Sequence, residues 1–313
     1  APAASVEPAE AAGPAGSPPP GPAISGAVPE LLLPSPMRLL PSGPGFGTAV
    51  HAVYESVDPR APDLPGEVAR AVRAAVPPGS DVGVGADTLA EALYPSWVTP
   101  LGPLADGRRL CDIGTEDRLP ELAFELPLAG GEHPSATVRL GLVASLLRTH
   151  VPDDDLLAGY ADRLDHPALA GQVLRGYLNG SIDAVLRIRG EAGNPRYLVV
   201  DYKTNWLGGF PESGGEPVLT LGDYTPRRMA GAMMAAHYPL QALLYSVAVH
   251  RYLRWRQPDY DPDRHLGGIL YLFVRGMAGP QTPVVDGLPC GVFGWRPSGS
   301  LVCGLSDLLE RGA

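Results

Sequence analysis

Alternating apolar and polar positions predict a β-hairpin in the second half of the chain. The runs YLNGSIDAVLRI (177–188) and RYLVVDYKT (196–204) are rich in β-branched and aromatic residues and are separated by the turn segment RGEAGNP. Residues equidistant from the centre of a regular hairpin lie opposite each other, and the midpoint between Asp183 and Asp201 falls inside this turn. We therefore expect these two aspartates to be cross-strand neighbours, about 5 Å apart at Cβ.

Helical patterns and a second apolar run predict the elements that follow the hairpin. Segment 224–257 indicates two helices, the first opened by Thr225 and Pro226 and the second by Pro239. The sequence HLGGILYLFVRG then predicts a buried strand, and LSDLLERGA at the end of the chain predicts a short final helix.

The first half of the chain shows weaker patterns. Residues 1–36 are rich in Ala, Pro, Gly and Ser without periodicity, which is typical of a flexible linker, so we expect the folded domain to span residues 37–313. A Gly-rich loop then leads to Thr48, a candidate N-cap for a helix. Residues 60–170 are predicted to be largely helical, with one strand-like piece, LPELAFELPL. The whole pattern predicts a mixed α/β fold.

Composition limits the classes of function. The 313 residues carry a formal net charge of −10, which argues against a protein that holds DNA by a broad basic surface. A nucleic-acid role would have to come from a local site or from partners that deliver the strand. Three widely spaced cysteines and the lack of a long apolar run indicate a cytoplasmic protein without a membrane segment.

Lys203 is the only lysine among the 24 basic residues, and it follows Asp201 by two positions, so both side chains share one strand face. Two carboxylates about 5 Å apart repel by about 3 kcal/mol at an effective dielectric constant of 20, and a bound divalent cation would remove that cost. The grouping of Asp183, Asp201 and Lys203 fits metal-dependent hydrolysis of a phosphodiester, in which the ammonium orients water or stabilises the transition state. Arginine would fit poorly, because its planar fork is bulky and stays protonated.

Other residues are candidates for the same site, although the local pattern of each one alone favours a structural role. His51 lies in the helix after the Gly-rich loop, and Glu121 lies on the strand-like piece. Gln241 and Tyr245 are four residues apart in the helix after Pro239, so they share a face that could bring an amide and a phenol to a DNA phosphate.

Several of these segments resemble a known family. The segments GYLNGSIDAVLRI…YLVVDYKTNWLG, YTPRRMAGAMMAAHYPLQALLYSVAVHRYLR and DYDPDRHLGGILYLFVRG are similar to the C-terminal nuclease domain of RecB, the large subunit of exodeoxyribonuclease V. The similarity is nearly continuous from about residue 174 to 277, and it extends to GFGTAVHAVYE and ELAFELPL.

This resemblance implies a restriction-endonuclease-like fold, a mixed sheet flanked by helices. It implies metal ligation by His51, Glu121, Asp183 and Asp201, with Lys203 as the catalytic lysine. It also places Gln241 and Tyr245 in a Q-x-x-x-Y motif near the DNA path. The resemblance also implies that Mg²⁺ is the cofactor, that Mn²⁺ can substitute for it, and that Ca²⁺ inhibits.

The resemblance further implies partners: single-stranded DNA ends from unwound duplex, an upstream helicase portion of the same chain, and RecC- and RecD-like subunits. The leading hypothesis is a Mg²⁺-dependent exonuclease acting in double-strand break repair and linear DNA degradation. One alternative is a catalytically silent scaffold that binds DNA or subunits, and another is a structural Ca²⁺ site on an unrelated α/β fold.

Overall fold

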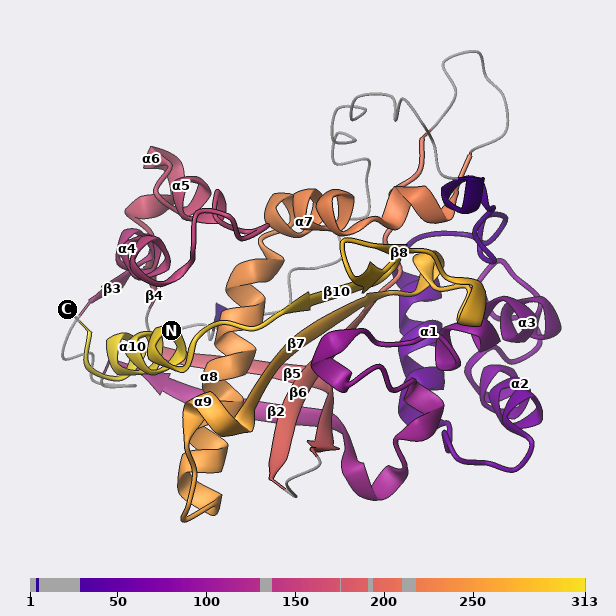
Figure 1. Ribbon diagram of the computed structural model, residues 1–313, viewed down its shortest axis with the longest axis horizontal. Coiled ribbons are helices and arrows are strands. Elements are labelled where there is room, and N and C mark those ends of the chain that lie inside the picture. Colours follow the sequence, from indigo (N-terminus) through magenta and orange to yellow (C-terminus); the bar gives the residue numbers. More distant parts are fainter. Residues whose placement is uncertain are drawn as a thin grey trace.

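A mixed β-sheet lies at the centre of the molecule, with helices on both faces (Figure 1). The computed structural model describes residues 4–5, 29–129, 137–174, 176–190, 194–209 and 218–312. The strand order is β1-β5-β6-β7-β10, and β2 pairs with β5. The strands are β1 (Ala4–Ser5), β2 (Arg118–Leu128), β5 (Gly176–Arg189), β6 (Pro195–Lys203), β7 (Leu266–Phe273) and β10 (Val292–Trp295).

The sheet contains both parallel and antiparallel neighbours. Strands β6 and β7 run parallel, as do β1 and β5, whereas the pairs β2–β5, β5–β6 and β7–β10 are antiparallel. Two short ladders lie outside it: β3 (Val138–Arg139) with β4 (Val173–Leu174), and β8 (Val284–Val285) with β9 (Leu288–Pro289). The structure therefore confirms the prediction of an α/β protein with a mixed sheet.

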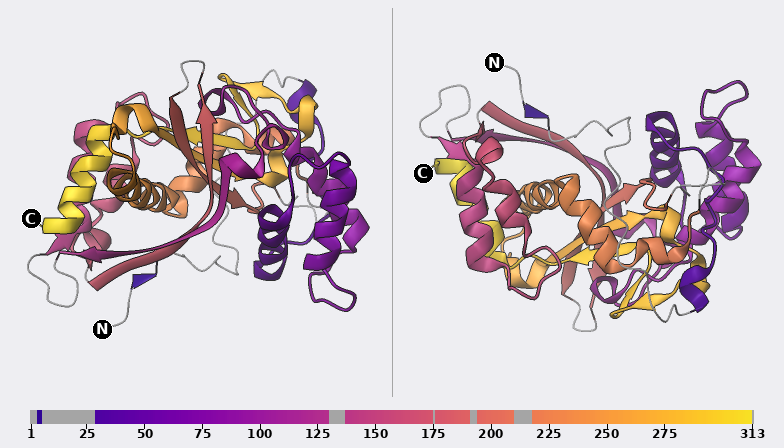
Figure 2. Two further views of the ribbon diagram at one scale, coloured as in Figure 1. Left: turned by 90° about the horizontal axis from the view of Figure 1, so that it is seen from below. Right: turned by 90° about the horizontal axis from the view of Figure 1, so that it is seen from above.

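The helices form two groups, one on each face of the sheet (Figure 2). The first group packs on one core cluster and comprises α1 (Pro44–Ser56), α2 (Leu64–Ala75) and α3 (Ala86–Trp97). The second group comprises α4 (Leu140–His150), α5 (Tyr160–Leu164), α6 (Pro167–Ala170), α7 (Pro226–Ala235), α8 (Tyr238–Arg256), α9 (Pro262–His265) and α10 (Gly299–Arg311). Short 3₁₀ turns are η1 (Pro29–Leu32), η2 (Pro103–Ala105), η3 (Leu110–Asp112), η4 (Thr115–Asp117), η5 (Leu221–Tyr224), η6 (Val274–Gly276) and η7 (Gly279–Gln281).

The predicted hairpin is confirmed as β5 and β6. Their pairing runs from Arg189↔Pro195 to Ala184↔Val200, and the same register continued by one residue sets Asp183 opposite Asp201. The two helices predicted in segment 224–257 are also confirmed, since both α7 and α8 begin with proline in their first turn. The final helix is longer than predicted, because Ser298 caps it by accepting a hydrogen bond from the Leu301 amide.

Two predictions near the N-terminus were wrong. Helix α1 begins at Pro44, four residues before Thr48, because Gly43 adopts a positive φ of 119° and the ring of Pro44 is suited to a first helical position. The linker boundary at residue 36 was placed too late: Ser35 is fully buried, and its amide donates to the carbonyl of Leu219 at 3.0 Å. Residues 1–3 and 6–28 of the predicted linker lie outside the described residues.

A fully buried arginine ties the N-terminal segment to the sheet. Arg275 follows β7, and its guanidinium donates to the carbonyls of Thr204, Met37, Leu40 and Pro41. Thr204 directly follows the last residue of β6. Because buried carbonyls without donors are costly, these bonds fix the exit of β6 against the segment that leads into α1.

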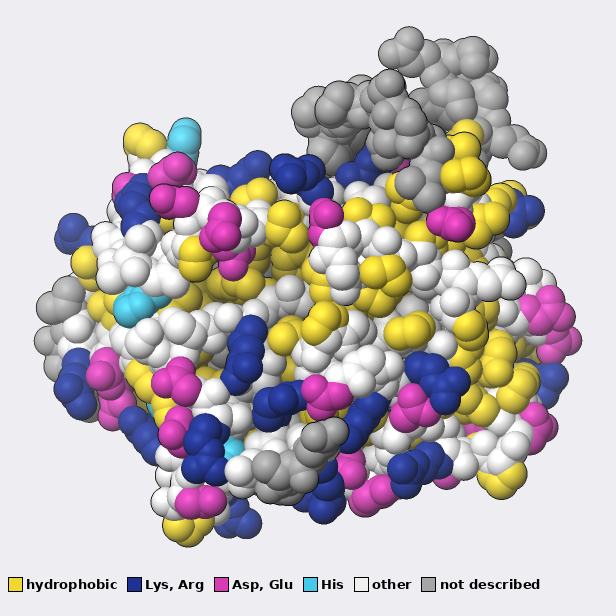
Figure 3. Space-filling model, viewed as in Figure 1, with side chains coloured by type: hydrophobic (Ala, Val, Ile, Leu, Met, Phe, Trp, Pro, Cys, Tyr) yellow, Lys and Arg dark blue, Asp and Glu magenta, His cyan; other side chains and the backbone are white. Residues whose placement is uncertain are grey.

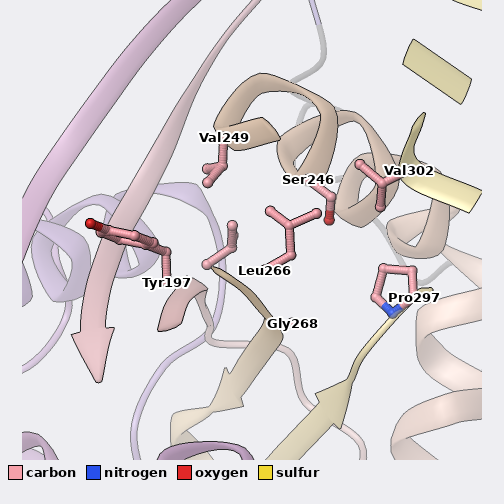
Figure 4. A pocket seen from close by; sticks show the side chains of 8 residues that line it. Tyr197, Ser246, Val249, Leu266, Gly268, Pro297 and Val302 are labelled. Atoms are coloured by element: carbon pink, nitrogen blue, oxygen red, sulfur yellow. The ribbon is translucent and has the colours of Figure 1, made fainter. Parts of the chain in front are cut away.

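A very small cavity lies between α8 and the start of β7 (Figure 4). Its volume is about 10 Å³, and Tyr197, Ser246, Leu266 and Gly268 are among the residues that line it. Such a space holds at most one water molecule, so it is no substrate pocket. Among the described residues, none of the helices combines the length and apolarity needed to cross a bilayer.

Candidate active site

Four of the predicted site residues meet where β5 and β6 come together beside α1. His51 comes from α1, Asp183 from β5, and both Asp201 and Lys203 from the end of β6. The Tyr202 amide donates to Oδ2 of Asp183 at 2.8 Å, which fixes this carboxylate against β6. The sheet thus brings together residues from separate parts of the chain.

Asp201 and Lys203 form a buried ion pair. The Nζ atom of Lys203 lies 2.6 Å from Oδ1 of Asp201, and their side chains are only 11% and 3% exposed, respectively. Tyr202 between them points to the opposite face, where its ring stacks on Tyr54 with centroids 3.9 Å apart. This alternation is the strand periodicity predicted from the sequence.

His51 bridges the two strands through both ring nitrogens. Nε2 lies 2.9 Å from the carbonyl oxygen of Tyr202, so it must donate, and Nδ1 lies 3.5 Å from Oδ1 of Asp183. Burial acts to lower the pKa of His51, but the hydrogen bond and charge of Asp183 outweigh it and raise the pKa to about 9. A neutral imidazole has only one N–H group, which here would be the Nε2–H that donates to the Tyr202 carbonyl. The lone pair of Nδ1 would then face the negative Asp183 carboxylate, so the protonated ring is favoured.

The two residues of the buried ion pair also have perturbed pKa values. Burial raises the pKa of Asp201 to about 6, although the charge of Lys203 opposes this rise and that of Asp183 adds to it. Burial acts to lower the pKa of Lys203, but the charge and hydrogen bond of Asp201 together with the charges of Tyr238 and Asp183 outweigh it, so that the pKa of Lys203 is raised. The ammonium therefore stays charged and neutralises a carboxylate that burial alone would protonate.

The donor set fits a hard divalent cation in its chemistry. Two carboxylates and an imidazole whose Nδ1 can lose its proton lie close together, and the close contact of the buried Oδ1 of Asp201 is with the ammonium of Lys203. Within the described residues, no three or more His, Cys, Asp or Glu side chains come together as a group that could hold a metal ion. The protonated ring of His51, which lies beside Asp183, and the ammonium of Lys203 supply the positive charge in this arrangement.

Glu121 makes no hydrogen bond or ion pair with these four residues in the described part of the chain. It lies on β2 at the position that faces Asp183, between the pairs Pro120↔Ala184 and Leu122↔Ile182, but the regular pairing is interrupted there. Glu121 has a positive φ of 46° and an exposed side chain, for which the described part of the chain offers no hydrogen bond or ion pair. Its role as a ligand stays a prediction.

Gln241 and Tyr245 share a face of α8, as predicted, but both are buried. The amide Nε2 of Gln241 donates to the Tyr245 hydroxyl at 3.0 Å, and its Oε1 accepts from the hydroxyl of Tyr271 at 3.0 Å. Gln241 and Tyr245 are therefore connected to the site by the hydrogen bond to Tyr271 of β7, and not across an exposed surface. Contact with DNA stays a prediction for both residues.

The curated proteins that this chain resembles share one name across different bacteria. The chain is 54% identical to RecBCD enzyme subunit RecB of Mycobacterium tuberculosis over 285 residues, 90% of this chain. It is 54% identical to the same subunit of Mycolicibacterium smegmatis over 282 residues, and 32% identical to that of Escherichia coli K12 over 273 residues. The chain belongs to the RecB family.

The chain spans only part of these RecB relatives: 25% of the two mycobacterial proteins and 19% of the Escherichia coli protein. The matched segment covers 90% of this chain for the mycobacterial relatives and 86% for the Escherichia coli one. No family model matches the sequence. The resemblance to RecB drawn from the sequence is thus confirmed.

Sequence reasoning on this RecB homologue missed two tyrosines beside Lys203. Tyr238 is the first residue of α8, and Tyr271 pairs with Asp201 in the parallel register of β6 and β7. Their rings lie within 4.1 and 5.4 Å of the Lys203 Nζ. The pairing of parallel strands leaves no local signal in the sequence, so Tyr271 could not be found that way.

The raised pKa of His51 leads to a pH-dependent stability. Since the pKa in the folded state is about 9 against an ordinary value of 6.5, folding favours the protonated ring. This stabilisation is fully present below pH 6.5 and is lost as the pH rises through 9. Because the side chain is 37% exposed, solvent screening reduces the gain to about 1 kcal/mol.

We therefore expect His51→Asn to lower the free energy of unfolding by about 1 kcal/mol below pH 6.5, and by much less above pH 9, in the presence of a chelator. Urea denaturation of parent and variant across this range measures the difference. The exposed His166→Asn variant controls for loss of a histidine outside the site. A deficit that stays constant or grows with pH would contradict the ion pair.

Proposed function

We propose that the chain is a metal-dependent deoxyribonuclease that hydrolyses DNA phosphodiesters as part of a helicase–nuclease acting in double-strand break repair. The observation that supports this proposal most is the meeting of His51, Asp183, Asp201 and Lys203 where β5 and β6 come together beside α1, in a chain of the RecB family. A buried carboxylate and a desolvated lysine beside the partly buried Asp183 are costly to desolvate, and the hydrolysis of a phosphodiester uses each of these groups.

In this proposal, Asp183, Asp201 and His51 hold Mg²⁺, with Glu121 as a further ligand. The bound ion supplies Lewis-acid stabilisation of the charge that develops on the phosphate. His51 keeps its ring oriented by donating from Nε2 to the Tyr202 carbonyl, so that Nδ1 can serve as the ligand once it is deprotonated. Lys203 presents a compact donor to the attacking water or to the phosphate.

The carboxylate oxygens among the proposed ligands bear on the choice of metal ion. We propose that Mn²⁺ substitutes for Mg²⁺, and that Ca²⁺ inhibits, since Ca²⁺ prefers six to eight ligands in a looser geometry. We also propose a restriction-endonuclease-like core, supported by the mixed sheet with helices on both faces and by the placement of the acidic residues on paired strands.

The surface charge bears on how DNA reaches the site. Figure 3 shows basic and acidic side chains intermingled on one face of the molecule, without a continuous basic area. With a net charge of −10, this favours delivery of single-stranded ends by partners over capture from bulk solution. We propose that these partners are a helicase portion of the same protein and RecC- and RecD-like subunits.

Metal dependence is the direct test of this proposal. We expect the chain to degrade linear single-stranded DNA in Mg²⁺ or Mn²⁺, to stop on addition of a chelator, and to resume when excess metal is restored. We also expect the melting temperature to rise with metal concentration, because an ion that binds only the folded state stabilises it by mass action.

The alternative of a silent scaffold gives a different pattern. It predicts no metal-dependent hydrolysis and little thermal stabilisation by either ion, both for the chain alone and for the chain rejoined to its helicase portion. Cleavage that persists in excess chelator would contradict the metal-dependent mechanism itself.

A further inference from the structure

The ammonium of Lys203 lies against the faces of two tyrosine rings. Its Nζ is 4.1 Å from the ring centroid of Tyr238 and 5.4 Å from that of Tyr271, within the range of cation–π attraction. The two rings are nearly parallel, with centroids 5.7 Å apart and an interplanar angle of 15°. Because the Lys203 side chain is only 11% exposed, water screens this attraction weakly.

Both rings are held in place by hydrogen bonds. The hydroxyl of Tyr271 lies 3.1 Å from the backbone carbonyl oxygen of Tyr238 and 3.0 Å from Oε1 of Gln241, and these two acceptors share its single proton. The Gln241 amide in turn donates to Tyr245, and the amide of Asn205 donates to the Tyr238 hydroxyl at 3.4 Å. The rings of Tyr238 and Tyr271 are thus held in fixed positions beside Lys203.

Fixed rings beside the ammonium reduce the mobility of Lys203, whose four-carbon side chain otherwise has many rotamers. Fixing such a side chain costs up to about 2 kcal/mol of entropy, and the ion pair with Asp201 alone constrains only one side of the ammonium. The ring of Tyr238 covers another side and leaves the remaining N–H donors for a ligand in the site.

We propose that Tyr238 is a positioning residue, whose ring face holds the Lys203 ammonium in the orientation used for hydrolysis. This inference rests on the proposed nuclease function. Gln241 and Tyr245 then act indirectly. Gln241 bonds to both Tyr245 and the Tyr271 hydroxyl, and Tyr271 in turn contacts the backbone of Tyr238 at the start of α8.

The unique lysine allows a test that needs no nuclease activity. Because Lys203 is the only lysine in the chain, its modification by an amine-reactive ester can be followed by mass spectrometry, with the α-amino group as an internal reference. We expect Tyr238→Phe, which keeps the ring, to match the parent, and Tyr238→Leu to speed the modification of Lys203 by about tenfold. Tyr252→Leu, on an exposed part of α8, is the matched control and should not change the rate.

Activity gives the second readout as a double-mutant cycle. On single-stranded DNA in Mg²⁺ we expect Tyr238→Leu to lower kcat by about tenfold with KM unchanged, and Tyr238→Phe to retain most of the parent rate. In a Lys203→Ala background, Tyr238→Leu should have no further effect on the residual rate. A merely structural tyrosine would lower activity by the same factor in both backgrounds.

The outcomes separate the two proposals. If Lys203→Ala cleaves far more slowly than the parent while Tyr238→Leu matches the parent in rate and modification, the positioning role is overturned and the nuclease assignment stands. If Tyr238→Phe falls as far as Tyr238→Leu, the ring face is not what holds the ammonium, and the inference is likewise overturned. If Lys203→Ala cleaves as fast as the parent, the proposed function fails, and the positioning role fails with it.

Discussion

Replacement of Asp201 by Asn is expected to lower the rate of DNA hydrolysis by at least about 10³-fold while the protein stays folded. Asn has nearly the same shape, and its carbonyl oxygen can still accept a hydrogen bond from Lys203, which lies 2.6 Å from Oδ1 of Asp201. The variant lacks the buried negative charge that a hard cation requires. We therefore also expect stabilisation by Mg²⁺ or Mn²⁺ to disappear.

The measurement combines cleavage of labelled linear single-stranded DNA with thermal unfolding at increasing metal concentration. Asp223→Asn is a matched control, because Asp223 is a buried carboxylate paired with Arg228 at the same distance of 2.6 Å. This control should keep both cleavage and metal stabilisation. Full activity in Asp201→Asn would place the active centre elsewhere.

Replacement of Lys203 by Ala is expected to lower the cleavage rate by about 10²–10³-fold, the usual loss when one preorganised donor to a transition state is removed. In contrast to Asp201→Asn, this change should leave stabilisation by Mg²⁺ intact or increase it, because a cation that competes for Asp201 is gone. The two variants therefore separate loss of the metal from loss of the donor.

Lys203→Arg tests whether positive charge alone is enough. The space between Asp201 and the Tyr238 ring is buried and holds a compact ammonium, so the planar guanidinium should not restore activity. Arg228→Ala, which removes the partner of Asp223, controls for loss of a cation from an ion pair. A Lys203→Arg variant as active as the parent would contradict the specific need for lysine.

Much of the site was predictable because it depends on local geometry. The hairpin register follows from the turn position, and it correctly gave the pairing up to Ala184↔Val200, whose continuation by one residue sets Asp183 opposite Asp201. The two-residue period of a strand likewise put Asp201 and Lys203 on one face, with Tyr202 on the other. The start of α1 was misjudged, since Gly43 and Pro44 compete with Thr48 as starting signals.

The sequence by itself therefore determined the pairing of the two aspartates and the lysine, because hairpin and strand geometry act over a few residues. Only the tertiary structure decided that His51 bonds to the Tyr202 carbonyl, that Glu121 remains exposed, and that Tyr238 and Tyr271 enclose the ammonium. These contacts depend on how helices pack on the sheet and on the pairing of parallel strands distant in the chain. The free energy that fixes them comes from burial of the whole core rather than from any local pattern.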